Sequence, residues 1–130
     1  MHSPSLPCPC GTGIVYGRCC GPWHHGPQHL QAPDAERLMR SRYSAYVLNL
    51  LDYLRDTWHP TTRPAHIEPN PPDWKWLGLQ VKRHTVLDDR HAEVEFVARG
   101  RSGGKGQRLH EVSRFLREDG RWFYVDGDVS

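Results

Sequence analysis

The chain has 130 residues, with 17 lysines and arginines against 15 aspartates and glutamates, so its formal net charge is only +2. This balance argues against a nucleic acid or an anionic membrane surface as the main partner. No apolar run approaches the ~20 residues that span a bilayer, so we expect no membrane insertion. The length suits one core of ordinary size plus a short appendage.

All four cysteines lie within the first twenty residues, as Cys8, Cys10, Cys19 and Cys20. Two close pairs separated by a turn can bring four thiolates around one zinc ion at a zinc–sulfur distance of ~2.3 Å. Glycines follow the first pair, and they can adopt the positive φ angles that let a backbone fold around an ion. The sequence therefore predicts a Zn²⁺ site with these four cysteines as ligands.

Other interpretations of this segment stay open. A redox or disulfide role would require strain if Cys19 and Cys20 bonded to each other, because they are adjacent. His24 or His25 could replace one of the vicinal cysteines, or both could lie in a solvated loop. The N-terminus lacks the charged and apolar regions of a secretory signal. We therefore expect a reducing cytoplasm as the compartment.

A helical pattern follows the cysteine-rich segment. Asp34 is a suitable N-cap, and apolar residues then recur at steps of three and four as far as Leu54. This predicts one helix, or two helices broken near Asn49, ending by His59 and Pro60. Prolines at positions 60–72 predict an irregular connection.

Beyond that connection the apolar period changes from 3.6 to 2, which is typical of half-buried strands. Alternation near residues 77–81 and 92–98 predicts two strands joined by a turn at Asp88 and Asp89. A longer flexible loop is expected over residues 100–106. Asp119 and Gly120 predict a tight hairpin between strands at 112–116 and 122–125. The fold class is therefore α+β, with a helix laid across one face of a curved antiparallel sheet.

Two motifs carry a resemblance to known families. The run Cys-Pro-Cys-Gly-Thr-Gly, Tyr16 and the vicinal cysteine pair are similar to the SEC-C motif, a zinc-binding module. The chain as a whole resembles the YchJ family, on the segments 38–46, 57–60, 76–79, 113–115 and 124–127. This resemblance implies a SEC-C zinc module at residues 1–33 and a domain of the nuclear transport factor two-like, or cystatin-like, fold at residues 34–130.

Domains of that fold often enclose a pocket between helix and sheet, although fold alone does not assign a function. The side chains that could line such a pocket are Tyr43, His59, Trp76, Glu111, Ser113, Arg114, Tyr124 and Asp126. Simpler roles stay open for several of them. His59 could cap a helix end, Arg114 could pair with Asp126 or Glu111 across strands, and the tryptophans could fill the core.

Two function classes follow from these observations. We expect a zinc-dependent protein-interaction module, because four protein ligands leave no open coordination position for catalysis. Substitution of Cys10 by Ser should then release the metal while the strands persist. The alternative is a small enzyme or ligand-binding protein that uses the pocket. Contact with nucleic acid or ribosomes through Arg18, His24, His25, Arg40 and Arg42 is a weaker hypothesis.

Overall fold

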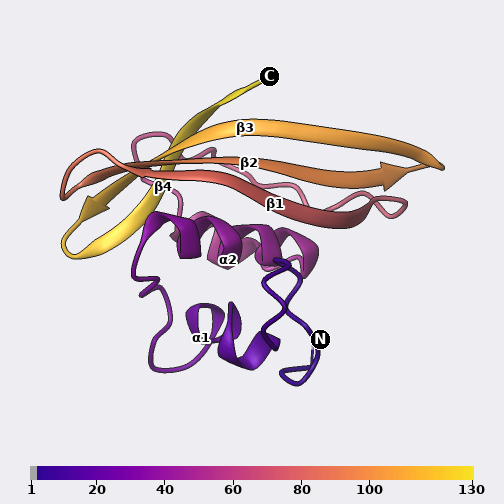
Figure 1. The fold of residues 1–130 in the computed structure, drawn as a ribbon, viewed down its shortest axis with the longest axis horizontal. Helices are drawn as coiled ribbons and strands as arrows, with labels where there is room; N and C mark the ends of the chain where they lie inside the picture. The colour runs from indigo at the N-terminus through magenta and orange to yellow at the C-terminus, as the bar shows by residue number, and fades with distance from the viewer. Residues whose placement is uncertain (1–2) are drawn as a thin grey trace.

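The computed structural model describes residues 3–130 as four helical segments and four strands (Figure 1). The helical segments come first along the chain and the strands follow without interruption. In order, the elements are η1 (Tyr16–Arg18), α1 (Gly21–His24), α2 (Ala35–Val47), α3 (Leu51–Asp56), β1 (Lys75–Val86), β2 (His91–Ser102), β3 (Lys105–Glu118) and β4 (Arg121–Val129).

The main helix α2 begins and ends where the sequence predicts. The carboxylate of Asp34 accepts a hydrogen bond from the Arg37 amide at 2.8 Å, which caps the first turn. After α2, Asn49 has a φ of 56°. A left-handed residue interrupts the α-helical hydrogen-bond pattern, so the chain turns and α3 starts at Leu51. The predicted break near Asn49 is confirmed.

The strands form one antiparallel sheet in the order β1-β2-β3-β4. Asp119 and Gly120 both have positive φ and connect Glu118 to its partner Arg121, so the predicted tight hairpin is confirmed. The predicted turn at Asp88 is also present, because its carboxylate accepts hydrogen bonds from two following backbone amides.

The long loop predicted over residues 100–106 is wrong. Strands β2 and β3 continue as far as the pair Ser102 and Lys105, and only Gly103 and Gly104 form the turn. Gly100 lies inside β2, and a glycine is needed there because the Trp74 ring covers it. A Cβ at this position would lie 2.0 Å from a carbon of that ring. Polar and glycine residues suggested a loop, but a ladder needs only backbone pairing and can extend beyond the buried part of a sheet.

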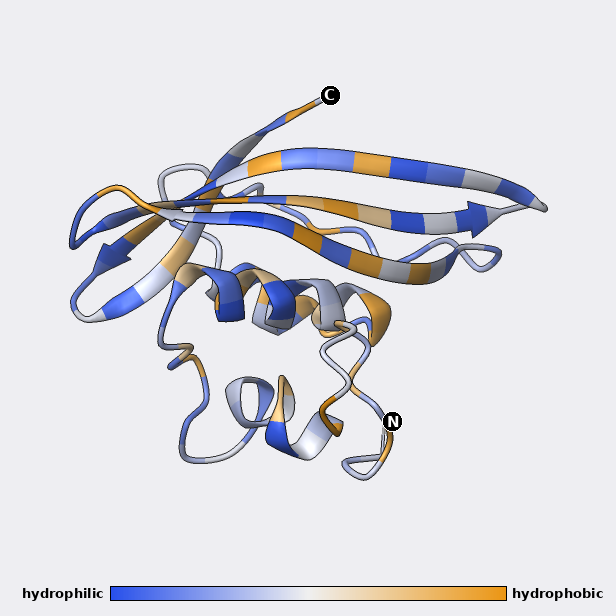
Figure 2. Cartoon of the chain, viewed as in Figure 1, coloured by the Kyte–Doolittle hydropathy of each residue, from blue (hydrophilic) through white to orange (hydrophobic). Residues whose placement is uncertain are grey.

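Helix α2 lies across one face of the sheet, and the cysteine-rich segment lies on the other side of α2 (Figure 1). Hydrophobic residues alternate with hydrophilic ones along the strands, as expected for a sheet with one covered face (Figure 2). The predicted α+β architecture is thus confirmed. No helix among residues 3–130 is long and apolar enough to cross a membrane.

One buried cluster joins the cysteine-rich segment to the sheet. Cys10 and Cys20 belong to the same cluster as Leu38 of α2 and Val94 and Phe115 of the strands. The segment therefore has no core of its own, and it completes the core on the outer side of α2. The division into units at residues 1–33 and 34–130 stays a prediction.

Candidate metal centre and cavity

The first cysteine pair lies in a tight, ribbon-like loop. The Cys8 amide donates to the Ile14 carbonyl at 2.9 Å, and the Gly11 amide donates to the Cys8 carbonyl at 3.2 Å. Gly11 and Gly13 both have a φ of 83°, which a residue with a side chain rarely adopts. These two glycines let the chain reverse within a few residues, as the sequence predicts.

The second pair stands at the junction of two short helices. Cys19 follows η1, and Cys20 is the residue before α1, where its carbonyl accepts from the amides of Trp23 and His24. Gly21 is required here, because a Cβ would lie 2.8 Å from the Tyr16 carbonyl oxygen. This close turn directs both vicinal sulfurs toward the first pair.

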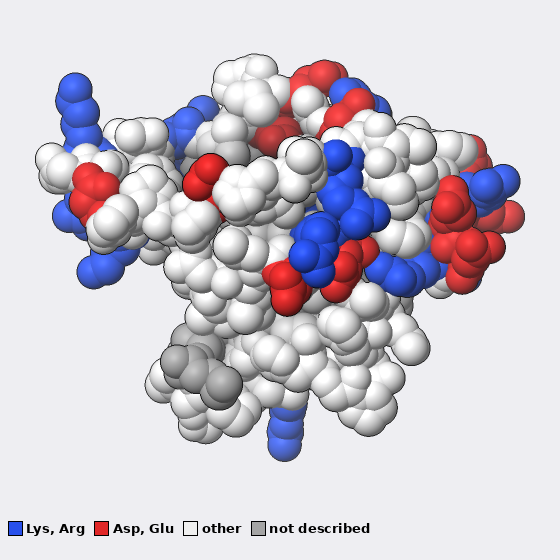
Figure 3. All heavy atoms as spheres, turned by 180° about the vertical axis from the view of Figure 1, so that it is seen from behind, with Lys and Arg blue, Asp and Glu red and all other residues white. Residues whose placement is uncertain are grey.

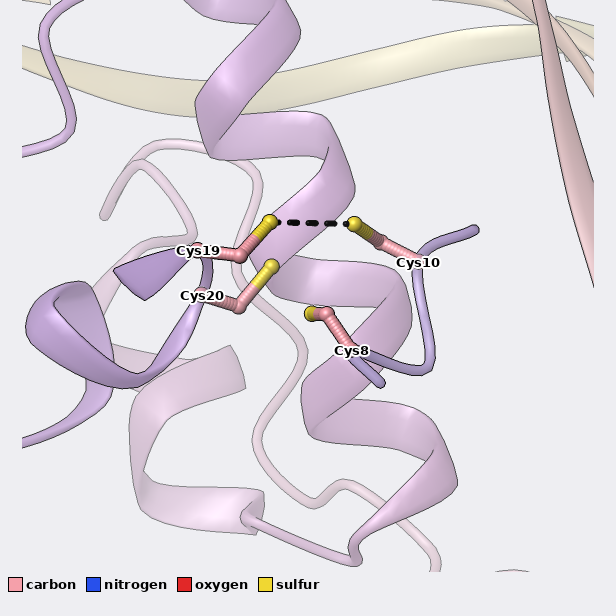
Figure 4. A group of neighbouring side chains, drawn as sticks. All are labelled: Cys8, Cys10, Cys19 and Cys20. Carbon is pink, nitrogen blue, oxygen red and sulfur yellow. Dashed lines mark hydrogen bonds between the residues drawn. The ribbon is translucent and has the colours of Figure 1, made fainter. Parts of the chain in front are cut away.

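The four cysteine sulfurs converge on one point (Figure 4), and all lie within 4.8 Å of one another. The sulfurs of Cys10 and Cys19 are 3.5 Å apart. A tetrahedron with zinc–sulfur bonds of ~2.3 Å has edges of about 3.8 Å, whereas a disulfide requires about 2.05 Å. The four thiols are free, and the arrangement could hold a metal ion.

The electrostatics of the cluster favour a cation at its centre. Hydrogen bonds from Cys10 and Cys20 hold the pKa of Cys8 far below its usual range. Burial raises the pKa of Cys19 to about 11, and hydrogen bonds to Cys10 and Cys8 raise that of Cys20 far above its usual range. Cys19 and Cys20 therefore keep their protons beside an ionised Cys8, because several negative charges cannot share this volume. A divalent cation would take the place of those protons.

Outer contacts hold the sulfurs in place. The Thr12 hydroxyl lies 3.2 Å from the Cys19 sulfur, and the Ser44 hydroxyl lies 3.5 Å from the Cys8 sulfur. Arg40 donates to the Cys10 carbonyl at 3.1 Å. Ser44 and Arg40 come from α2, and they lie 36 and 30 residues along the chain from Cys8 and Cys10, the cysteines that they contact. No sequence pattern indicated them, because their contact depends on how α2 packs.

His24 is buried and engaged on both ring nitrogens. Its Nε2 lies 2.8 Å from the Ser41 carbonyl, and because a carbonyl can only accept, Nε2 carries the proton and donates. The other ring nitrogen of the neutral ring, Nδ1, then accepts a hydrogen bond from the Tyr16 hydroxyl at 2.6 Å. Desolvation by burial lowers the pKa of His24 to about 4, so the ring is neutral. The solvated-loop interpretation fits His25, which is exposed, and is wrong for His24.

Comparison with known proteins shows which family has this architecture. A family model described as YchJ, middle NTF2-like domain, matches residues 34–127, and the SEC-C motif model matches residues 5–22. The chain belongs to the YchJ family. The UPF0225 protein of Bordetella pertussis is 62% identical over 129 residues, covering 98% of this chain and 97% of that protein. A UPF0225 protein of Methylibium petroleiphilum is 57% identical over 128 residues, covering 98% and 91%.

Solved structures of SEC-C motif proteins share the whole YchJ-family fold seen here. The solution structure of one from Rhodopseudomonas palustris has a TM-score of 0.81 at 34% identity, and the match covers 95% of this chain and 98% of that one. A crystal structure from Psychrobacter arcticus has a TM-score of 0.76 at 32% identity, covering 97% and 82%. The resemblance inferred from the motifs is confirmed.

A cavity of about 300 Å³ lies between α2 and the sheet. Its lining is mainly apolar and aromatic and comes from α2, from Trp58 after α3, from the start of β1, and from strands β2, β3 and β4. Five side chains named from the sequence line it: Tyr43, Trp76, Glu111, Ser113 and Tyr124. The structure brings these five together from four different elements.

The other three named residues do not line this cavity. Arg114 pairs with Asp126 at 2.6 Å and with Asp128 at 2.9 Å, as the cross-strand interpretation predicts. His59 lies 3.2 Å from Glu118, and its Nδ1 lies 2.7 Å from the Thr61 hydroxyl. Arg114 is next to Ser113, and neighbouring residues of a strand point to opposite faces of a sheet.

Arg42 lines the cavity and was missed as a pocket residue. The sequence placed Arg42 in the basic set considered for nucleic acid, but its side chain is 5% exposed and faces the cavity. Its Nη1 donates to the Leu54 carbonyl and to the Thr57 hydroxyl. With Arg42 and His24 buried, the basic set proposed for nucleic acid does not form one surface.

Proposed function

We propose that the SEC-C segment binds one Zn²⁺ through the thiolates of Cys8, Cys10, Cys19 and Cys20. The observation that carries this proposal is the convergence of four free sulfurs within 4.8 Å, with one pair near the edge length of a zinc–thiolate tetrahedron. Thiolates favour soft or borderline metals over Mg²⁺ and Ca²⁺. Such reduced thiols also support a cytoplasmic location.

We further propose that the metal is structural and that the segment is a docking element for a protein partner. The surface beside the cysteines includes exposed Leu6, Ile14 and Val15. Arg18 is the single Lys, Arg, Asp or Glu among residues 1–33. Basic and acidic residues intermingle over the sheet side, while the segment below is almost uncharged (Figure 3). An uncharged surface with apolar side chains suits a protein partner better than nucleic acid.

The test compares two substitutions within one loop. Cys10→Ser removes a ligand, whereas Ile14→Ser removes an exposed apolar side chain and leaves all four sulfurs. Wild-type protein and Ile14→Ser should each contain about one zinc per chain by elemental analysis, and Cys10→Ser should contain much less. Full metal content in Cys10→Ser would refute the ligand assignment.

The docking role has its own readout. A protein partner that is cross-linked to the wild-type protein in cells of the source organism should no longer be cross-linked to Ile14→Ser, although this variant keeps its zinc. It should also be lost with Cys10→Ser. A partner retained by both variants would mean that this segment is not the docking surface.

The cavity favours a second candidate function, the binding of a small ligand by the sheet domain. Its volume of about 300 Å³ equals that of about ten waters and reaches the lower end of known ligand pockets. A few polar groups interrupt an otherwise apolar lining, which is typical of sites that orient a ligand. This function does not depend on the metal.

A further inference from the structure

The cavity contains a cation that makes no direct ion pair with a carboxylate. Arg42 is 5% exposed, and it takes part in no ion pair within residues 3–130. Its charge is stabilised by two hydrogen-bond acceptors and by two aromatic rings. The guanidinium carbon lies 5.0 Å from the Trp58 ring centroid and 4.5 Å from that of Tyr124.

A buried guanidinium with no carboxylate bound to it is unusual, because removing the charge from water is costly, and the Glu111 charge acts on Arg42 without a direct contact. Its hydrogen bonds to the Leu54 carbonyl and the Thr57 hydroxyl both use Nη1. The planar group offers five N–H donors in all, arranged to bind a carboxylate by two parallel hydrogen bonds. An anion entering the cavity would therefore gain a strong, already desolvated partner.

A second charge, on Glu111, restricts how such an anion can enter. The Glu111 carboxylate accepts hydrogen bonds from the Ser113 and Tyr124 hydroxyls. Tyr124 therefore contacts Arg42 with its ring and Glu111 with its hydroxyl. The ligand's own carboxylate must stay at the Arg42 end, because like charges repel. Near Glu111 the ligand needs a hydrogen-bond donor instead.

The rest of the lining defines the body of the ligand. Tyr43 and Trp76 meet edge to face at 5.5 Å, and Phe96, Phe115 and Met39 complete an apolar surface. Flat rings and branched chains bury apolar area well against such walls. The volume admits a molecule of roughly ten to fifteen non-hydrogen atoms, scaled from the volume of about ten waters.

We infer that the cavity binds a small aromatic or branched-chain carboxylate that carries a hydroxyl or amino donor, with its carboxylate on Arg42 and the donor at Glu111. The inference rests on the ligand-binding function proposed for the cavity and specifies the chemical class of the ligand. It is independent of the zinc proposal.

The experiment uses the full chain and three probe acids, namely phenyllactate, 4-hydroxyphenylacetate and 2-hydroxyisocaproate, each paired with its methyl ester. Amide chemical-shift changes are measured by titration. At least one acid should shift the resonances of α2 and of β3 near Ser113, with an affinity at least about tenfold above that of its ester. A charge-assisted bidentate contact supplies a difference of that size.

Two variants locate the effect. In Arg42→Gln the preference for acid over ester should disappear. Because Arg42→Gln removes buried hydrogen bonds and could unfold the protein, Ala98→Leu serves as a second variant that keeps Arg42 and fills part of the cavity. It should abolish binding of acid and ester alike.

The outcomes separate this inference from the function on which it rests. If the esters bind as tightly as the acids, the cavity is a ligand site and the assignment of a carboxylate to Arg42 is wrong. If no probe shifts the cavity resonances at about 10 mM, where even millimolar affinities would register, both the inference and the ligand-binding function are refuted.

Discussion

The buried ring of His24 makes the free energy of unfolding fall in acid. Its pKa falls from 6.5 to about 4 on folding, because burial disfavours the charged ring. A lowered pKa of a histidine means that the unfolded chain binds the proton more readily. The stabilisation is therefore full above pH 6.5, and it is lost progressively as the pH falls toward 4.

The magnitude follows from these two values. Between about pH 7 and about pH 5, preferential protonation of the unfolded chain costs about 2 kcal/mol of the free energy of unfolding. The matched variant is His24→Gln, whose neutral amide can still donate to the Ser41 carbonyl but cannot titrate. Loss of the Tyr16 hydrogen bond should make the variant less stable near pH 7 by about 1–3 kcal/mol.

Urea unfolding of both proteins at the two pH values provides the assay, with zinc content measured in each sample so that metal release can be matched. The wild-type midpoint should fall by about 1 M urea more than the variant midpoint between the two pH values, given typical urea slopes for small proteins. Equal falls in the two proteins would refute the assignment of a neutral, buried His24.

Three further predictions concern the core, a strand and a cap. Chelation should lower the melting temperature of the whole chain, because the cysteines complete one side of the core. Far-UV circular dichroism should still report the strands, because the sheet pairs independently of the cysteines. An unchanged melting temperature would contradict the shared core. Gly100→Ala should destabilise by about 1–3 kcal/mol because its Cβ would meet the Trp74 ring, whereas Gly106→Ala, which meets nothing within 4 Å, should cost less in the same urea assay; equal costs would contradict the packing of Trp74. Asp34→Ala should cost about 1 kcal/mol through loss of the α2 cap, and Asp34→Asn should recover most of that stability; no loss in the alanine variant would mean that the cap contributes nothing.

The features that sequence predicted well are those determined by local chemistry. The break at Asn49 and the turn at Asp119 and Gly120 depend on residues that tolerate positive φ, so a few neighbouring letters indicate them. The clustering of the cysteines also follows from their spacing. The family resemblance then supplied the fold type, which periodicity alone restricted only to α+β.

The features that sequence missed depend on packing between distant segments. Arg42 is two residues from Arg40 and looks equally polar, yet Arg40 reaches the cysteine loop whereas Arg42 lines the cavity. Arg114 was named with Ser113 as a cavity residue, yet it pairs with Asp126, which is the cross-strand alternative that the sequence left open. Which face of an element is covered is a property of the assembled fold, so composition could not separate these cases.

The measurement that tests the central claim most directly is native mass spectrometry of protein purified without chelator, combined with titration of free thiols before and after chelation. The account predicts one zinc per chain, and four thiols that react only after the metal is removed. A metal-free chain whose thiols react at once, or whose mass reveals disulfides, would contradict it.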